Sequence, residues 1–329
     1  MVKIIAEIGS VHDGSYGNAK SLIKAVADAG AWGVKFQHHI ANQESTDYAP
    51  NPTYFTDESR KDYFNRIAFT RGQWEGLYKL AKDNSLQFIV SPFSIKSLEE
   101  LLITGVDIIK VASGEVTNTR LLKEVYRKNI KAILSSGMST MDELKEACDV
   151  LGESLLCLMQ CTSEYPCKPE NVGLNNIKLL AELGDSEPGF SDHTIGSVAS
   201  ILAVGEGAEY IEKHVTFSQK MYGSDAKHSM EINEFHGFIN DLKTAYTITK
   251  SVQNKDESAL KLSTMKSIFE KSLVYANNLK KSHILQEGDF SLKKPGDGLP
   301  SNMLETLIGK RLLHSVQYDA QVKLTDFGD

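Results

Sequence analysis

The chain has 329 residues, of which 41% are hydrophobic, so it can bury a large core and we expect more than one domain. Its 36 basic and 43 acidic residues give a net charge of −7, which argues against nucleic acid or an anionic membrane as the main partner. No apolar stretch approaches the roughly 20 residues of a membrane span. The sequence begins directly with a strand-like run, so we expect a cytoplasmic protein.

The cysteine content argues against two further classes of protein. Four cysteines in so long a chain are too few for a disulfide framework, and none has the Cys-x-x-Cys spacing of a zinc or redox site. Cys157 and Cys161 lie in an apolar run, a position typical of buried thiols that only pack.

Short apolar, β-branched runs alternate with helical patterns over the first 250 residues. The expected strands are, in chain order, 3–8, 32–37, 86–91, 106–112, 131–135, 155–161, 188–191 and 208–215. Eight strand–helix units in this length predict an α/β fold in which the strands close into a TIM (β/α)8 barrel. An open, doubly wound sheet is the alternative on the pattern alone.

The helical segments carry their own start and stop signals. One face of residues 18–29 is apolar, and a glycine follows the segment. The residues of that face are Ala19, Leu22, Ile23, Val26 and Ala29. The spacings Thr-x-x-Gln from residue 70 and Thr-x-x-Glu from residue 140 predict capping boxes, because each side chain can satisfy an amide of the first helical turn.

The connection from residue 40 to residue 69 is long and holds no clear strand. It carries several aromatic residues, among them Tyr48, Tyr54 and Phe55. Connections of this length are usually functional or disordered. The aromatic residues favour an ordered cover beside the barrel mouth.

The pattern changes after the barrel. Residues 251–264 form a polar linker, and residues 265–329 hold short strand-like pieces broken by glycine and proline, as in a small β-rich domain. Those pieces are Ser272–Tyr275, Phe290–Lys293 and Val322–Leu324. A domain of this size is too small to carry the chemistry alone. We therefore expect residues 1–250 to be the catalytic domain and the C-terminal domain to be a lid or an oligomer element.

Polar residues end every expected strand, and two lysines interrupt strand runs that are otherwise apolar. They are Lys35 and Lys110. A buried ammonium group is costly without a partner, so each lysine needs an anion. For either lysine alone, a salt bridge to a neighbouring strand or an outward position between helices fits as well as a ligand does. Together with serines at several strand ends, they suit a small phosphorylated acid, because hydroxyls donate hydrogen bonds without bulk.

Two histidines lie at the ends of adjacent expected strands. His193 and His214 could converge on one cation. Two nitrogen ligands with open positions for water and substrate suit Mn²⁺ or a similar ion that acts as a Lewis acid on a carbonyl. The alternative is a pair of structural histidines that are only packed and hydrogen-bonded.

Further motifs follow the strands in a recognisable order. They are Glu7-Ile8-Gly9-Ser10, His12-Asp13-Gly14, Val34-Lys35-Phe36-Gln37, Ser91-Pro92-Phe93, Lys110-Val111-Ala112-Ser113-Gly114-Glu115, Leu134-Ser135-Ser136-Gly137-Met138, Cys161-Thr162-Ser163-Glu164-Tyr165-Pro166, Ser191-Asp192-His193-Thr194, Glu212-Lys213-His214 and Gly223-Ser224-Asp225. This series resembles the N-acetylneuraminate (sialic acid) synthase family over nearly the whole chain. Residues 293–298 and 308–310 resemble the antifreeze-like domain that those enzymes carry at the C-terminus.

The resemblance implies a reaction, a metal and an assembly. The reaction condenses phosphoenolpyruvate with an N-acylmannosamine-type aldehyde and releases phosphate. A divalent metal ion, Mn²⁺ first and Mg²⁺ or Co²⁺ as alternatives, polarises the aldehyde. The assembly is a domain-exchanged homodimer, in which the antifreeze-like domain of one subunit covers the site of the other.

The resemblance also implies roles for individual residues. The metal ligands are His193 and His214. The residues that hold phosphoenolpyruvate are Lys110, Ser113, Ser135, Ser163 and Ser191. Those that face the sugar are Gln37, Tyr165, Asp225 and Lys294. Asp13 and Glu115 are candidate acid/base groups, because a carboxylate must handle the water and hydroxyl protons, and Lys35 is the third catalytic candidate.

Three parts of the sequence depart from the family pattern. Val11 stands where an asparagine is usual, Lys294 where an arginine is usual, and residues 38–39 are both histidine where smaller residues are expected. Lysine cannot make the bidentate fork of arginine. All three departures fall where the sugar should lie, so the acceptor sugar stays open.

Three other functions stay open beside that of an N-acetylneuraminate synthase. One is synthesis of another nonulosonate, of the legionaminate or pseudaminate type. The second is a phosphoenolpyruvate-dependent synthase of deoxy-sugar acids acting on a phosphorylated aldose, as octulosonate and heptulosonate enzymes do, although these are not expected to carry the C-terminal module. The third, an inactive barrel that serves as a binding or scaffold subunit, is disfavoured by the intact lysines, histidines and acids at the strand ends.

Overall fold

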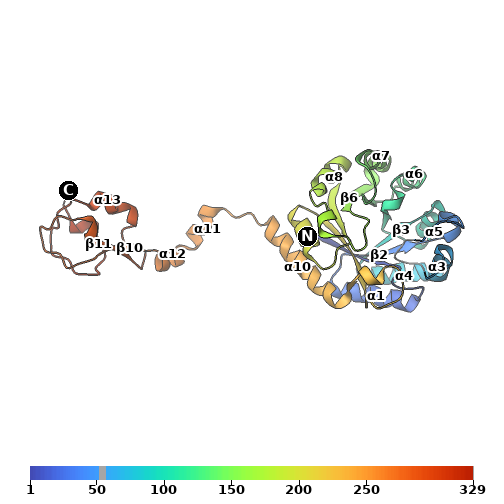
Figure 1. The fold of residues 1–329 in the computed structure, drawn as a ribbon, viewed down its shortest axis with the longest axis horizontal. Coiled ribbons are helices and arrows are strands. Elements are labelled where there is room, and N and C mark those ends of the chain that lie inside the picture. The colour runs from blue at the N-terminus through green and yellow to red at the C-terminus, as the bar shows by residue number, and fades with distance from the viewer. Residues whose placement is uncertain (52–56, 329) are drawn as a thin grey trace. The chain divides into compact units, whose positions relative to one another are not determined.

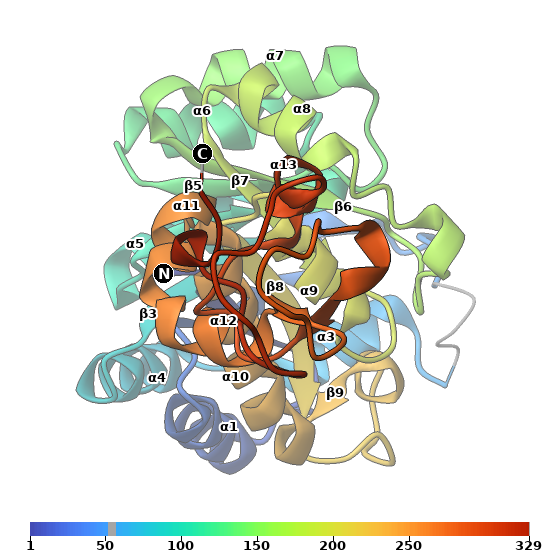
Figure 2. The ribbon, with the colours of Figure 1, turned by 90° about the vertical axis from the view of Figure 1, so that its left-hand side faces the viewer.

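The computed structural model describes residues 1–51 and 57–328, which form two compact units, Met1–Lys250 and Ser251–Asp329. In the first unit eight parallel strands close into a barrel, because the eighth strand pairs with the first as well as with the seventh. Helices surround these strands (Figure 1 and Figure 2). The predicted TIM-barrel fold is confirmed.

Each observed strand of the barrel overlaps its predicted range. The strands are β1 (Lys3–Gly9), β2 (Gly33–His38), β3 (Gln87–Pro92), β4 (Ile108–Val111), β5 (Ala132–Ser135), β6 (Leu155–Cys161), β7 (Glu187–Asp192) and β8 (Tyr210–Thr216). A short strand, β9 (Met230–Glu231), pairs with the end of β8. The helices of this unit are α1 (Tyr16–Ala29), α2 (Ala41–Glu44), α3 (Arg60–Ile67), α4 (Arg71–Asp83), α5 (Ile95–Thr104), α6 (Thr119–Arg127), α7 (Met141–Leu151), α8 (Asn176–Gly184), α9 (Val198–Gly205) and α10 (Ile232–Lys250).

The local signals in the sequence act as predicted. Helix α1 buries all five residues of its apolar face and ends at Gly30, whose φ of 90° is the left-handed geometry that suits glycine. Thr70 and Thr140 form capping boxes at the starts of α4 and α7. These signals fix where the helices begin and end, and so fix the loops at the barrel mouth.

The interior of the barrel is layered. Its lower layer is apolar and holds Ile5, Ile89, Ile108, Ile133, Cys157 and Tyr210, with Met159 packed against them. Side chains alternate along a strand, so the residue two positions further on also points inward, one layer nearer the carboxyl ends of the strands. That second layer holds the buried polar residues Glu7, Ser91, Lys110, Ser135 and Glu212. Strand periodicity therefore places a polar layer directly on an apolar base.

The second unit has a small hydrophobic core of its own. Strands β10 (Ser272–Tyr275) and β11 (Phe290–Lys293) pair antiparallel, as predicted. The third expected strand, at Val322–Leu324, is wrong: Gln321 makes an isolated bridge to β10, and the chain then turns in a 3-10 segment. Most of this unit therefore consists of loops that pack around the short two-stranded ribbon.

Three short helices also belong to the second unit. They are α11 (Lys255–Lys261), α12 (Ser263–Phe269) and α13 (Leu304–Leu307). The polar stretch expected to be a linker thus contains a helix, which begins where the Asn254 side chain accepts hydrogen bonds from two amides of the first turn.

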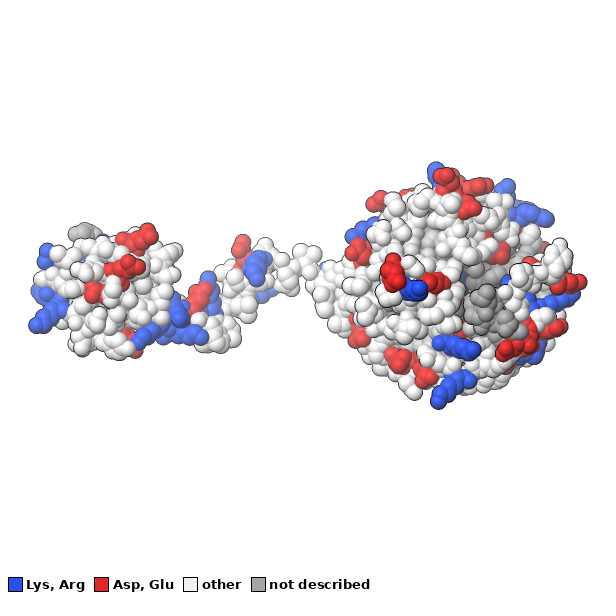
Figure 3. Space-filling model, viewed as in Figure 1, with Lys and Arg blue, Asp and Glu red and all other residues white. Residues whose placement is uncertain are grey.

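Among the described residues no helix is both long enough and apolar enough to cross a bilayer. On the barrel face seen in Figure 3, acidic and basic side chains are interspersed, and neither sign covers that face alone.

Candidate active site

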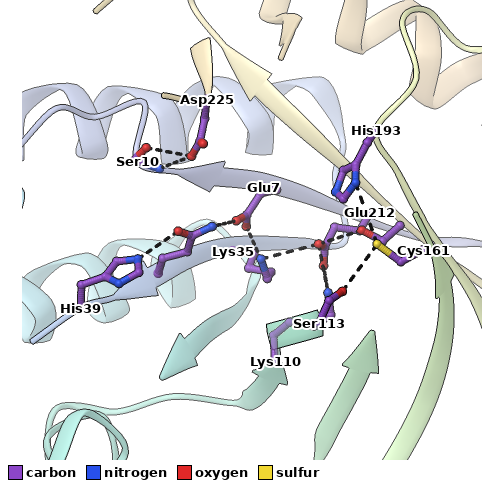
Figure 4. A network of polar contacts seen from close by, with 12 residues as sticks. Glu7, Ser10, Lys35, His39, Lys110, Ser113, Cys161, His193, Glu212 and Asp225 are labelled. Atoms are coloured by element: carbon purple, nitrogen blue, oxygen red, sulfur yellow. Dashed lines mark hydrogen bonds and ion pairs between the residues drawn. The ribbon is translucent and has the colours of Figure 1, made fainter. Parts of the chain in front are cut away.

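Four charged side chains form a network in the polar layer of the barrel (Figure 4). Lys35 Nζ lies 2.7 Å from one Glu7 oxygen and 3.6 Å from one Glu212 oxygen. Lys110 Nζ lies 2.9 Å from the other Glu212 oxygen. All four side chains are almost completely buried. Each lysine therefore has its anion on another strand, and the network carries two charges of each sign.

The two carboxyl groups of the network differ in acidity. Burial alone would raise the pKa of Glu212, but Lys110 and Lys35 hold that pKa well below its usual range. Burial raises the pKa of Glu7 against the opposing effect of Lys35. Neither glutamate carries a predicted role beyond ending a strand. The alternation of inward and outward positions along a strand could have identified them, because each glutamate follows an inward-facing residue of the apolar layer by two positions.

Serine hydroxyls line an inner cavity of about 60 Å³ beside this network. The hydroxyl oxygens of Ser91 and Ser135 are buried and have no hydrogen-bond partner among the described residues. Ser191 donates to Glu212 over 3.2 Å. Buried hydroxyls without partners are costly, so these groups are donors available to an anion. Ser91 carries no predicted role and joins the predicted serines here.

Two further predicted serines approach from loops. A Cβ atom at Gly137 would collide with the hydroxyl oxygens of both Ser113 and Ser163, so three loops converge with no room for a side chain at this glycine. The structure thus brings together the whole set predicted for phosphoenolpyruvate. Every member lines the inner cavity or the larger cavity outside it: Lys110, Ser113, Ser135, Ser163 and Ser191.

His193 and His214 lie together at the ends of β7 and β8. Their ring centroids are 5.6 Å apart, and the Tyr165 ring packs 4.1 Å from that of His193. Burial lowers the pKa of His214 to about 3, so this imidazole is neutral, which is the form that binds metals. Its Nδ1 is buried without a hydrogen-bond partner among the described residues.

His193 is held differently from His214. Its Nδ1 lies 2.7 Å from the Thr162 carbonyl oxygen and 3.9 Å from the Cys161 sulfur. Burial lowers the pKa of His193, but these two neighbours outweigh burial and raise it overall. The contact to Thr162 fixes the ring and leaves Nε2 as the nitrogen free to meet a ligand.

An outer cavity of about 500 Å³ adjoins the inner one. The two form one pocket, because five residues line both: Gln37, Ala112, Ser113, Tyr165 and His214. Asp225 lies on the outer wall and accepts hydrogen bonds from the Ser10 amide and hydroxyl, each over 2.8 Å. Burial alone would raise the pKa of Asp225, but His214 and the Ser10 contacts lower it. The predicted sugar-facing residues Gln37, Tyr165 and Asp225 all line this outer cavity.

Three predicted site residues lie elsewhere. Asp13 pairs with Arg66 over 2.8 Å, and Glu115 accepts a hydrogen bond from Asn118 over 2.7 Å while burial raises its pKa. Among the described residues, neither carboxylate is part of the lining of the two cavities. Lys294 belongs to the second unit, where its ammonium nitrogen lies 4.8 Å from the centre of the Phe269 ring. Their roles stay predictions.

The connection between residues 40 and 69 supplies one side of the outer cavity. Asn51 and, from α3, Arg60, Tyr63 and Phe64 line it. Tyr54 and Phe55, two of the aromatic residues that suggested a cover, lie outside the described residues. Helix α3 therefore gives the outer wall a largely aromatic character that the strands do not provide.

Comparison with known proteins agrees with this geometry. The model of the NeuB family matches residues 22–254. An N,N'-diacetyllegionaminic acid synthase of Campylobacter jejuni is 33% identical, over 97% of this chain and 98% of its own. A pseudaminic acid synthase of the same species is 28% identical, over 99% and 96% of the two chains. The crystal structure of an N-acetylneuraminic acid synthetase from Leptospira borgpetersenii matches with a TM-score of 0.70 at 26% identity, over 81% of this chain and 92% of its own.

The chain belongs to the NeuB family. The predicted kinship with sialic acid synthases and the predicted enzyme class, a nonulosonic acid synthase, are thereby confirmed. The relatives differ in the acid that each is named for, so membership alone does not fix the acceptor sugar of this NeuB enzyme.

Proposed function

We propose that this NeuB enzyme condenses phosphoenolpyruvate with the open-chain aldehyde of an N-acyl amino sugar and releases phosphate. The observation that carries the proposal is the continuous pocket. Its inner end holds two buried lysines, serine hydroxyls suited to an anion and the histidine pair, and its outer end is wide and partly aromatic, with His214 lining both ends. An anionic donor and a sugar acceptor would therefore meet at the histidines.

Phosphoenolpyruvate suits the inner end of the pocket. Lys110 donates hydrogen bonds to both Glu212 oxygens, over 3.1 and 2.9 Å, and an ammonium group has three N–H donors. The third donor, with the hydroxyls of Ser91 and Ser135, is available to a carboxylate or phosphate. Because Glu7 and Glu212 already balance the lysines, neutral donors must supply much of the affinity for this anion.

A divalent ion at the histidine pair is part of the proposal, with Mn²⁺ preferred and Mg²⁺ or Co²⁺ as alternatives. The residues fit such an ion, because His214 keeps a buried ring nitrogen without a partner among the described residues and His193 lies beside it. Within the described chain no three His, Cys, Asp or Glu side chains gather to hold a metal alone. Two protein nitrogens would leave positions for water and the sugar. The bound ion would supply Lewis acidity at the aldehyde oxygen.

The chain's own residues would orient the reactants and move protons. C3 of phosphoenolpyruvate attacks the aldehyde carbon, water adds at C2, and phosphate leaves with cleavage of the C–O bond. Gln37 and Asp225 would hold the sugar, and Lys35 would offset the negative charge of the enol phosphate. Asp13 and Glu115 remain candidate proton carriers, but Glu7 lines the inner cavity and is better placed in this geometry.

The outer wall favours one class of acceptor sugar over another. The rings of Tyr63, Phe64 and Phe93 line it together with the Met138 side chain. Such a wall suits an acceptor that carries acyl or deoxy groups, as expected for an enzyme of the legionaminate or pseudaminate type, better than one rich in hydroxyls.

We further propose a homodimer in which the second unit of one chain, resembling an antifreeze-like domain, covers the pocket of the other. Helices α11 and α12 bury none of their residues and expose an apolar stretch, in which each side chain is at least half exposed: Leu260, Leu262, Met265, Ile268 and Phe269. Apolar stretches of this kind mark interaction surfaces. Lys294 lies over Phe269 and would be carried with this surface toward the sugar.

Phosphate release from phosphoenolpyruvate tests the proposed reaction. The purified chain is mixed with phosphoenolpyruvate and Mn²⁺. Separate assays then add N-acetylmannosamine, a diacetamido hexose or a phosphorylated aldose. We expect release only with an N-acyl sugar and only with a divalent ion present. Release with the phosphorylated aldose would favour the deoxy-sugar acid alternative. Binding of phosphoenolpyruvate without turnover of any acceptor would favour a binding barrel.

A further inference from the structure

His39 occupies a tightly defined place in the outer wall. Its ring is stacked between those of Phe64 and Phe93, with centroid distances of 3.7 and 4.1 Å and an interplanar angle of 13° on both sides. It is 8% exposed, and its free edge lines the outer cavity. Two stacking contacts of this kind fix the plane of the imidazole. Its ring nitrogens can therefore form hydrogen bonds only within that plane.

Both ring nitrogens of His39 meet acceptors. Nδ1 lies 3.0 and 2.9 Å from the two oxygens of Glu44, whose side chain is 4% exposed. Nε2 lies 3.1 Å from the side-chain oxygen of Gln37. A carboxylate and an amide oxygen cannot donate, so His39 is the donor in both contacts.

The orientation of the Gln37 amide is set at its other end. Its nitrogen donates to Glu7 over 2.9 Å, and the second oxygen of Glu7 meets the Lys35 ammonium over 2.7 Å. Turning the amide around would set its oxygen against the Glu7 oxygen and its N–H groups against an N–H of His39. The two contacts therefore hold Gln37 from both sides, and Figure 4 shows this row from His39 to Lys35.

We propose that His39 is a positioning and specificity-determining residue that acts through Gln37. An amide nitrogen has two hydrogens, and Glu7 takes one of them. His39 occupies one lone pair of the amide oxygen and holds the amide in this orientation, so the donor that Gln37 can offer to the pocket is the remaining N–H. The sugar group that meets this N–H must be a hydrogen-bond acceptor, and an N-acyl carbonyl is the strongest neutral acceptor on such a sugar. This inference rests on the proposed function.

The neighbouring His38 provides a matched control. It is 5% exposed, close to the value for His39, but its Nδ1 meets the Ser97 carbonyl over 3.3 Å and its ring packs on Trp74. It is not part of the lining of the inner or outer cavity as far as the described residues show. A loss of general packing would affect both histidines, whereas a loss of the Gln37 contact would affect His39 alone.

The test is a double-mutant cycle read as Michaelis constants. His39→Phe keeps the aromatic stack and removes both N–H groups. We expect it to raise the KM for the N-acyl sugar about tenfold, as for one lost hydrogen bond, and to leave the KM for phosphoenolpyruvate within about twofold. In a Gln37→Leu background, the same substitution should leave the KM for the sugar unchanged. His38→Gln should change neither constant.

A second variant guards against misfolding. Glu44 would be buried without its partner in His39→Phe, so the double variant His39→Phe/Glu44→Gln removes that charge and should reproduce the change in the sugar KM. An unchanged sugar KM in both variants overturns the inference, as does an equal rise in the Gln37→Leu background. The wild-type assay distinguishes failure of this inference from failure of the proposed function. If the wild-type chain turns over an N-acyl sugar and the His39 variants do not change its KM, only this inference is overturned. No turnover of any N-acyl sugar overturns the proposed function and this inference with it.

Discussion

The inner end and the outer wall of the pocket are built in different ways. The inner end comes from β1, β2, β4 and β8, whose inward residues place two lysines against two glutamates at nearly complete burial. The outer wall owes one side to α3 and to Asn51 in the connection before it, and its residues are mostly aromatic or neutral. One end is fixed by strand register, and the other by the packing of a long connection.

This difference separates the chemistry from the choice of acceptor. A charge pair at a strand position cannot move without shifting the register, which would turn the whole strand's side chains to the other face. A helix in a connection can change its rings without disturbing the barrel. The inner end therefore suits the step that all acceptors share, and the outer wall suits the part of the sugar that differs.

The largest effect is expected at the histidine pair, where the two ends meet. His214→Ala should lower kcat by roughly a thousandfold or more, because a Lewis acid contributes several kcal/mol to the barrier. Mn²⁺ binding, measured by electron paramagnetic resonance, should weaken in parallel while the circular dichroism spectrum stays unchanged. His236→Ala, at an exposed position on α10, is the control. Normal turnover by His214→Ala would remove the metal from the proposal.

A smaller effect is expected at the inner end. Lys110→Ala should raise the KM for phosphoenolpyruvate roughly 10- to 100-fold, because a charged hydrogen bond contributes about 1.5 to 3 kcal/mol, and should affect the sugar much less. Lys3→Ala provides the control, because Lys3 lies on a barrel strand at the opposite end and pairs with Glu187. Equal changes in both Michaelis constants would show that the two ends of the pocket do not act separately.

The sequence predicts the inner end better than the outer wall, for a physical reason. Strand positions repeat every two residues, so Lys35 and Lys110 could be singled out from their apolar neighbours as lysines that need an anion, although an outward position stayed open for each. That Lys35 pairs with Glu7 depends on the register of the neighbouring strands β1 and β2. That Lys110 pairs with Glu212 depends on which strands face each other across the closed barrel. The local pattern contains neither relation. The departure at His39 was visible in the sequence, but its stack depends on α3 and on Phe93 from a distant loop. The separation of Asp13 from both cavities likewise depends on the position of Arg66.

A third test asks whether the outer wall is complete within one chain. Deleting residues 265–329 should leave a folded barrel that binds phosphoenolpyruvate but turns over about tenfold more slowly, because water would reach the sugar site. Mixing this deletion with full-length His193→Ala should restore activity, since the intact lid of one chain would then cover the intact pocket of the other. Activity equal to the sum of the parents, after subunit exchange has been demonstrated, would place the lid on its own barrel.

The smallest effect is expected from the buried histidine behind the outer wall. Burial lowers the pKa of His38 to about 4, so the folded chain resists a proton that the unfolded chain accepts near pH 6.5. This contribution to stability is complete above pH 6.5 and is lost as the pH falls toward 4. At pH 5 the loss is about 2 kcal/mol relative to neutral pH. His38→Gln should therefore make the free energy of unfolding less dependent on pH between 7.5 and 5.

Urea unfolding followed by tryptophan fluorescence measures this dependence in the barrel, because Trp32 and Trp74 both belong to the first unit. The exposed His236, changed to glutamine, is the matched control and should leave the slope unaltered. The aromatic stack around His39 should stay intact in His38→Gln, so the Michaelis constant for the sugar should not follow the change in stability. If His38→Gln lowers both the free energy of unfolding and the affinity for the sugar, the outer wall and the barrel beneath it are one cooperative structure. The choice of acceptor would then not be independent of the barrel.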